Sequence, residues 1–299
     1  YEQSMAVYPV GGQTALDYGL PATTVGIAVS TKAIDQVIDF PVRDLTITVE
    51  AGIPMQRLAK LLEAEGLMLP LDVPQAEQAT LGGVIATNTN GPRRFGLGTV
   101  RDYVIGIEAV DGKGQLFHGG GRVVKNVAGY DFCKLLTGSL GTLGVITAAT
   151  VKVKPISEQT TTVVAIVPNG HCGEAAIASM LVSEATPVAV QWLQGDCWQQ
   201  LCGGGSKTAS QSIMAIQLAG TTAEVDWSQA TVLRELKAAG LTDGSILDPS
   251  QQQALWSAVC EFPANDAELV IQVKTVSSGV VEIIAKCREL NSDCVIQAA

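Results

Sequence analysis

Glycine is clustered in the first half of this chain, and the clustering restricts the fold more than any other feature of the sequence. Four clusters, several of them beside threonine or serine, occupy residues 9–14, 80–83, 90–94 and 138–144. Glycine lets the backbone adopt positive φ angles and approach a ligand closely, and consecutive N–H groups form a concave anion site. One Gly-Gly pair is more often a plain turn, but four clusters in one half together predict turns that hold a phosphate-bearing ligand.

Two common nucleotide-binding motifs are absent. The last cluster spaces its glycines as G-x-x-G-x-x-G and precedes a predicted strand at 145–147, whereas a Rossmann site needs G-x-G-x-x-G before a helix. The tract Gly204-Gly205-Ser206-Lys207-Thr208 ends like a phosphate loop but lacks the glycine four residues before its Gly-Lys pair. A phosphate ligand would therefore be held by another arrangement of turns.

Composition excludes several classes of protein. With 47% hydrophobic and 16% charged residues in 299, the chain can build large cores and is not disordered. A net charge of −10 argues against nucleic acid as a partner, and no apolar run is long enough to predict a transmembrane segment. Seven thinly spread cysteines indicate free thiols in a reducing compartment, the cytoplasm, and their spacing predicts no metal site.

The first half reads as mixed strand and helix. Residues 44–50 are β-branched and alternating, which predicts a strand, and Pro54 then begins a helix that ends before Gly66. Strands at 103–110 and 116–118 flank Asp111-Gly112-Lys113-Gly114, a strong hairpin signal.

Glycine clusters recur before Lys154-Pro155, whereas the sequence after it has one conspicuous glycine run, at 203–205. This change in glycine use predicts two domains, 1–155 and 156–299. The second half alternates strands and helices, which predicts an α+β layer: an antiparallel sheet with helices on one face. We predict strands at 161–167, 188–193, 213–218, 269–273 and 294–296, and helices at 174–182, 223–239, 254–260 and 280–290.

The order of motifs in the first 155 residues resembles the flavin-binding domain of the PCMH-type (vanillyl-alcohol-oxidase) flavoprotein superfamily. The tracts that carry this resemblance are Pro9-Val10-Gly11-Gly12, residues 44–52, Leu69-Pro70-Leu71-Asp72, Thr80-Leu81-Gly82-Gly83, Tyr130-Asp131 and residues 138–147. Gly91-Pro92-Arg93-Arg94, Val100-Arg101-Asp102 and residues 125–131 are most similar to the FAD-binding E subunit of glycolate oxidase (glycolate dehydrogenase). The second half resembles the family's cap domain only loosely.

The resemblance implies FAD, with its pyrophosphate at the first glycine loop and its ring at the border with the cap. Carried over position by position, the cofactor-binding residues are Pro9, Gly11, Gly12, Gln13, Thr14, Thr80, Gly82, Gly83, Gly141, Gly144, Val145 and Ile146. Many members attach the flavin to a histidine beside the first loop. Here the loop reads Gln13-Thr14, so we expect noncovalent FAD.

Oxidation of a 2-hydroxy acid needs a cation for the carboxylate, a base for the hydroxyl proton and an acceptor for the hydride. Arg93 and Arg94 are the candidate carboxylate clamp, because guanidinium pairs with carboxylate through two hydrogen bonds; a surface or domain-contact pair is the alternative. Lys125 and Tyr130 are further candidates. His118 and His171 are the only histidines, so the His-rich cap motif of related dehydrogenases is missing.

The resemblance implies a subunit that oxidises a small 2-hydroxy acid, glycolate first, and passes electrons to an iron–sulfur partner subunit. The alternatives are another flavin dehydrogenase, such as one for D-lactate, and a noncatalytic FAD-carrying subunit. Compared with the family, we expect both ends of the chain to be short.

Overall fold

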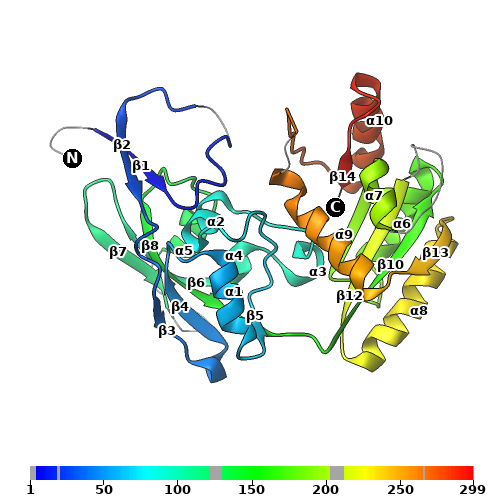
Figure 1. Cartoon of the computed structure of the whole chain (residues 1–299), viewed down its shortest axis with the longest axis horizontal. Helices are drawn as coiled ribbons and strands as arrows, with labels where there is room; N and C mark the ends of the chain where they lie inside the picture. The colour runs from blue at the N-terminus through cyan, green and yellow to red at the C-terminus, as the bar shows by residue number, and fades with distance from the viewer. Residues whose placement is uncertain (1–4, 19–20, 122–129, 203–211, 265–266, 299) are drawn as a thin grey trace. The chain divides into compact units, whose positions relative to one another are not determined.

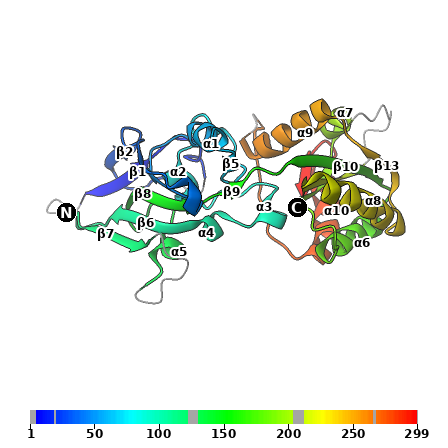
Figure 2. The same cartoon turned by 90° about the horizontal axis from the view of Figure 1, so that it is seen from below.

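Two separate five-stranded sheets organise this chain in a computed structural model that describes residues 5–18, 21–121, 130–202, 212–264 and 267–298 (Figures 1 and 2). Each sheet belongs to its own compact unit. The first unit comprises Tyr1–Gly91 and Gly98–Ile156, and the second comprises Pro92–Leu97 and Ser157–Ala299. The chain passes from the first unit to the second after Ile156, and Pro92–Leu97 makes a short earlier excursion into the second.

The sheet of the first unit is antiparallel, with strand order β3-β4-β8-β6-β7. Its strands are β3 (Val37–Asp39), β4 (Thr46–Glu50), β6 (Val104–Val110), β7 (Leu116–Gly120) and β8 (Val145–Lys152). The predicted hairpin is confirmed: β6 and β7 pair, and the Asp111 carboxylate accepts the N–H groups of Lys113 and Gln115. Two smaller pairs complete the strands, parallel β1 (Ala6–Val10) with β2 (Gly26–Ser30), and β5 (Leu67–Met68) with β9 (Lys154–Pro155).

The helices of the first unit bury apolar side chains against this sheet. In α1 (Met55–Glu63), which begins after Pro54 as predicted, Leu58 and Leu62 are one turn apart and fully buried. They share one core with Ile47 of β4 and Leu81 of α2. The other helical segments of this unit are α2 (Leu81–Thr87), α4 (Val100–Tyr103), α5 (Phe132–Leu136) and the 3-10 turn Val42–Asp44.

The sheet of the second unit is also antiparallel, with order β13-β10-β12-β11-β14. Its strands are β10 (Gln159–Val167), β11 (Ala189–Gln194), β12 (Ser212–Gly220), β13 (Thr242–Ile246) and β14 (Ile296–Ala298). The helical segments of this unit are α3 (Arg94–Leu97), α6 (Gly170–Leu181), α7 (Asp196–Leu201), α8 (Thr222–Ala238), α9 (Pro249–Glu261) and α10 (Val280–Leu290).

Helices cover both faces of the second sheet, so the prediction of helices on one face is wrong in this respect. Side chains alternate along β10: Val163 and Ala165 pack in a core with α6 and α8, whereas Val164 packs in a separate core with α7 and α9. Figure 2 shows α9 on one side of β10 and α6 and α8 on the other. On the α9 face, Trp256 Nε1 donates to the buried Thr162 Oγ1 at 2.8 Å.

In the second half of the chain, one predicted strand is wrong and two elements were missed. Residues 269–273 form no strand, and Leu269 and Ile271 are at least 70% exposed. Sequence patterning missed β13, whose five residues are all exposed, because an edge strand with Asp243 and Gly244 lacks the apolar alternation of a buried one. It also missed the short helix α7.

Candidate functional site

Three of the four glycine clusters meet around helix α2. The first turn, residues 11–14, lies against residues 78–80, and the turn at 138–141 lies against both α2 and Pro9. Residues far apart in the sequence are thereby gathered within one unit, which is the arrangement that a shared ligand requires.

Close backbone approach explains why the first turn uses glycine. A Cβ at Gly12 would stand 1.9 Å from the carbonyl oxygen of Gln78, and one at Gly11 would stand 2.3 Å from Thr80 Oγ1. Any larger residue at position 12 would therefore collide with main chain, which cannot rotate away. The first turn is seated on the segment that leads into α2.

The turn at 138–141 is fastened to α2 by its backbone. Gly138 N–H donates to Ile85 O at 3.0 Å, and Leu140 N–H donates to Ala86 O at 2.8 Å. Gly141 has a positive φ of 73°, and a Cβ there would meet the Pro9 ring at 3.2 Å. These contacts connect the last glycine cluster to the first through one short helix.

Not all of the glycine N–H groups are available to a ligand. Thr80 caps α2, and its Oγ1 accepts the Gly83 N–H at 3.3 Å, while the Gly82 N–H donates to Ala51 O at 2.8 Å. By contrast, no described residue accepts a hydrogen bond from the main-chain N–H of Gly12, Gln13 or Thr14. The first turn therefore presents free donors for a diphosphate, whereas Gly82 and Gly83 allow the close packing beneath it.

Unusual backbone conformations also gather around α2. Seven described non-glycine residues have positive φ, and four of these surround this helix: Gln13, Gln75, Asn88 and Leu140. Such conformations cost free energy and concentrate at functional sites. Gln75 and Asn88 were missed by the sequence reasoning, because neither lies beside a glycine pair.

Val145 and Ile146 open strand β8, where Ile146 is a core side chain only 6% exposed. Its side chain is committed to the core, so only its backbone is free for a cofactor. Gly144 permits close packing here, since a Cβ would lie 2.8 Å from Val110 O.

The predicted substrate residues are not gathered with the glycine turns within one unit. Arg93 and Arg94 lie in the Pro92–Leu97 segment of the second unit, where Phe95 packs in the core and Gly96 N–H donates to Val188 O at 3.1 Å. Arg93 is half-buried and Arg94 exposed. Tyr130, in the first unit, is 84% exposed, and Lys125 lies outside the described residues.

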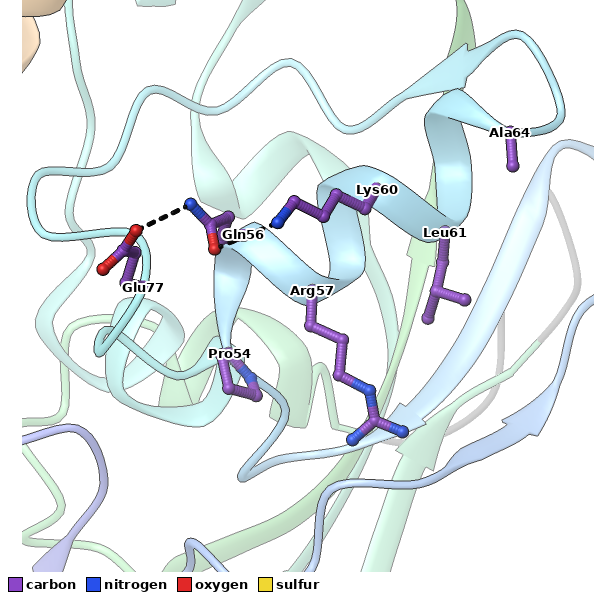
Figure 3. Close-up of a pocket in the computed structure, with 7 residues that line it drawn as sticks. All are labelled: Pro54, Gln56, Arg57, Lys60, Leu61, Ala64 and Glu77. Atoms are coloured by element: carbon purple, nitrogen blue, oxygen red, sulfur yellow. Dashed lines mark hydrogen bonds between the residues drawn. The ribbon is translucent and has the colours of Figure 1, made fainter.

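One hollow in the first unit lies elsewhere, along α1 (Figure 3). It encloses about 420 Å³. Its polar side chains bond to neighbours: Gln56 Nε2 donates to Glu77 Oε1 at 3.1 Å, Lys60 approaches Gln56 at 3.5 Å, and Arg57 pairs with Asp35 at 2.6 Å. None of the predicted site residues lines it, so the hollow does not replace the glycine turns as the candidate site.

Within the described parts of the chain, no helix is both apolar enough and long enough to cross a membrane. These residues also contain no group of three or more histidine, cysteine or acidic side chains placed to hold a metal ion.

Comparison with known proteins identifies the cofactor. Residues 1–120 match the family model described as an FAD binding domain. Glycolate oxidase subunit GlcD of Bacillus subtilis is 33% identical over 64% of this chain and 41% of that protein. Glycolate oxidase subunit GlcE of Escherichia coli is 38% identical over 48% of this chain and 41% of that protein. D-lactate dehydrogenase of Archaeoglobus fulgidus is 39% identical over 52% of this chain and 34% of that protein. The chain spans less than half the length of these relatives.

Solved structures agree on the fold. An alkyldihydroxyacetonephosphate synthase has a TM-score of 0.75 at 17% identity, covering 97% of this chain and 61% of that one. p-Cresol methylhydroxylase has a TM-score of 0.67 at 14% identity, and the match covers 87% of this chain and 59% of that one. The predicted fold class, mixed helix and antiparallel sheet of the PCMH type, is confirmed. Residues 1–120 therefore match the FAD-binding domain family model, and this match together with the relatives supports FAD as the cofactor of this chain.

Proposed function

We propose that this chain is the FAD-carrying part of an oxidoreductase that oxidises a small 2-hydroxy acid, with glycolate as the first candidate substrate. The convergence of the turns at 11–14 and 138–141 on α2 carries the cofactor part of the proposal. The names of the relatives, two glycolate oxidase subunits and a D-lactate dehydrogenase, support the substrate class. The assignment of 1–155 as the FAD-binding domain and 156–299 as a cap is part of this proposal.

The residues of the first turn fit a diphosphate. The N–H groups of Gly12, Gln13 and Thr14 have no described acceptor, and a net charge of −10 makes such local donors necessary for an anion. Bound FAD would supply the two-electron acceptor that hydroxy-acid oxidation requires. Pro9, against which Gly141 packs, holds the two turns together. Because Gln13 and Thr14 stand where many members carry a histidine, the flavin is held noncovalently.

The substrate's carboxylate would pair with Arg93 or Arg94, whose guanidinium groups offer parallel N–H donors. Lys125 and Tyr130 are weaker candidates for the same site. Neither His118 on β7 nor His171 on α6 is assigned as the base that takes the hydroxyl proton. That gap favours a subunit acting within a complex, whose electrons pass to an iron–sulfur partner. All seven cysteines are free thiols, which supports a cytoplasmic location.

Anaerobic titration of the purified, FAD-loaded chain with glycolate tests the function. Loss of the flavin absorbance near 450 nm with glycolate alone supports a catalytic chain, and loss only with the partner subunits present supports the subunit role. Faster bleaching by D-lactate would favour the dehydrogenase alternative that the archaeal relative suggests. No bleaching by either acid, even in the complex, would leave a noncatalytic FAD carrier, and a chain that cannot be loaded with FAD contradicts all three.

The clamp has its own test. Arg93→Ala should raise the KM for glycolate while the dissociation constant of FAD stays unchanged, because the role proposed for this arginine is to bind the carboxylate of the substrate. The control is Arg43→Ala, which removes a positive side chain from the 3-10 turn of the first unit. Equal loss of FAD and glycolate affinity in Arg93→Ala would overturn the clamp assignment.

A further inference from the structure

A second hollow lies in the other unit, at one end of its sheet, and encloses about 290 Å³. Strands β10, β11 and β12 contribute to it together with the start of α6 and one side of α10, two helices that pack against each other. A Cβ at Gly170 would stand 2.6 Å from Val281, which shows how closely the two helices approach here. Its polar side chains are Asn169, Trp192, Gln194, Ser212 and Arg288.

Arg288 lines this hollow, and one edge of its guanidinium group has no partner among the described residues. Its Nη1 donates to the carbonyl oxygen of Ser292, which fixes one end of the guanidinium. The Nε and Nη2 atoms are buried and have no partner among the described residues. The N–H bonds of these two atoms run parallel on one edge of the planar group, and this edge matches two oxygens of a carboxylate or phosphate.

Two other residues that line this hollow, both on β11, also carry unpaired polar atoms. Trp192 of β11 is 3% exposed, and no described residue accepts a hydrogen bond from its Nε1–H. The Oε1 of Gln194, two residues along that strand, likewise has no donor in the described part of the chain. Buried polar groups without partners are rare in folded proteins because each costs free energy. Two of these three residues, Arg288 and Trp192, carry unpaired donors, and one ligand that accepts hydrogen bonds would satisfy both.

The charge of the hollow specifies an anion. Helix α6 is 12 residues long and begins there, with Asn169 as its N-cap, so the positive end of the helix dipole points the same way. No aspartate or glutamate is among the described residues that line the hollow. Val281 and Ile284 supply apolar walls, which suit a compact ligand.

We propose that this hollow binds a small oxyanion with two coplanar oxygens, a carboxylate or inorganic phosphate, through Arg288, the Trp192 Nε1–H and the start of α6. This site is independent of the proposed FAD site, since it needs neither the flavin nor the glycine turns.

Calorimetry on the full chain tests the proposal, with sodium succinate and sodium phosphate as separate probes and sodium chloride at matched ionic strength as the blank. Saturable binding of at least one probe is expected, and comparing the two separates the carboxylate and phosphate sources. Trp192 fluorescence should change with the same midpoint. Absence of saturable binding for both probes in the millimolar range overturns the proposal, whether or not the chain contains flavin.

Variants locate the binding. Arg288→Lys keeps the charge but loses the two-point fork and should weaken binding about tenfold. Arg288→Gln should abolish binding while thermal melting shows the chain folded, because glutamine lacks both the positive charge and the two parallel N–H donors that bind the oxyanion. Arg234→Gln, an exposed arginine on α8, is the matched control and should bind like the parent. Unchanged binding in Arg288→Gln contradicts the assignment.

Discussion

Gly12→Ala tests how the first glycine turn is held. The new Cβ would stand 1.9 Å from Gln78 O and 2.6 Å from the carbonyl carbon of the same residue, whereas ordinary contact begins at 3.4 Å. Both contacts are with main chain, so no side-chain rotation relieves them. The turn or the 78–80 segment must therefore move by about 1.5 Å.

Two consequences follow from that movement. Overpacking of this kind costs about 1–3 kcal/mol of the free energy of unfolding, which corresponds to a fall in Tm of roughly 3–10 °C for a unit of this size. A displacement of about 1.5 Å also carries the N–H groups of Gly12, Gln13 and Thr14 beyond hydrogen-bonding distance of a bound diphosphate. Loss of two charge-assisted hydrogen bonds should raise the dissociation constant of FAD at least about a hundredfold.

The assay is fluorescence quenching of FAD titrated with apoprotein, together with thermal melting of the apoprotein. Gly112→Ala is the matched control, because a Cβ at Gly112 meets nothing within 4 Å and this glycine does not have a positive φ. It should leave both Tm and FAD affinity unchanged. If Gly12→Ala has the same Tm and FAD affinity as Gly112→Ala, the inferred packing of the first turn against residues 78–80 is incorrect.

Three further predictions concern other parts of the chain. Hydrogen bonds from Thr99 lower the pKa of Asp102, so its contribution to stability is present above its ordinary pKa of 3.8 and is lost as the pH falls through the lower folded value. Asp102→Asn should therefore be less stable than the parent at pH 7 in urea unfolding, and a difference that persists undiminished at pH 2 contradicts this. Burial raises the pKa of Cys133 to about 11 and that of Cys202 to about 12; both should resist iodoacetamide at pH 8 in the folded chain, and peptide mapping that finds either one alkylated as fast as in urea would refute the prediction. Trp256→Phe removes the donor to the buried Thr162 Oγ1 and should lower stability by about 1–3 kcal/mol; an unchanged urea midpoint would count against that bond.

The sequence predicted the elements that depend on local signals. Pro54 precedes the first residue of α1, Asp111 organises the β6–β7 hairpin, and the strand predicted at 145–147 is the start of β8. Each of these follows from backbone chemistry within a few residues, so no distant contact was needed to recognise it.

Elements whose structure depends on contacts with residues distant in the sequence were not predicted. Thr80-Leu81-Gly82-Gly83 reads as a turn in the sequence, yet it begins α2, because Gly82 packs on Ala51 and donates to its carbonyl oxygen. Likewise, Pro92–Leu97 belongs to the second unit because Phe95 packs against its core, although the residues on both sides of this segment belong to the first unit. We predicted a strand at 269–273, but among the described residues no strand pairs with this segment.

The resemblance gave the cofactor, and the structure refines how the glycine clusters serve it. The clusters were grouped as sources of bare N–H groups, yet the Gly82 and Gly83 donors are used within the protein. Only the hydrogen-bond pattern, which depends on the fold, separates glycines that present donors from glycines that permit close packing.

The central claim is that the first turn holds the diphosphate of FAD. Comparing the dissociation constants of FAD and riboflavin for the apoprotein tests it most directly, because riboflavin keeps the ring and lacks both phosphates. We predict that riboflavin binds at least about a hundredfold more weakly than FAD, and that Gly12→Ala removes most of this difference. Equal affinities for the two flavins would contradict the claim.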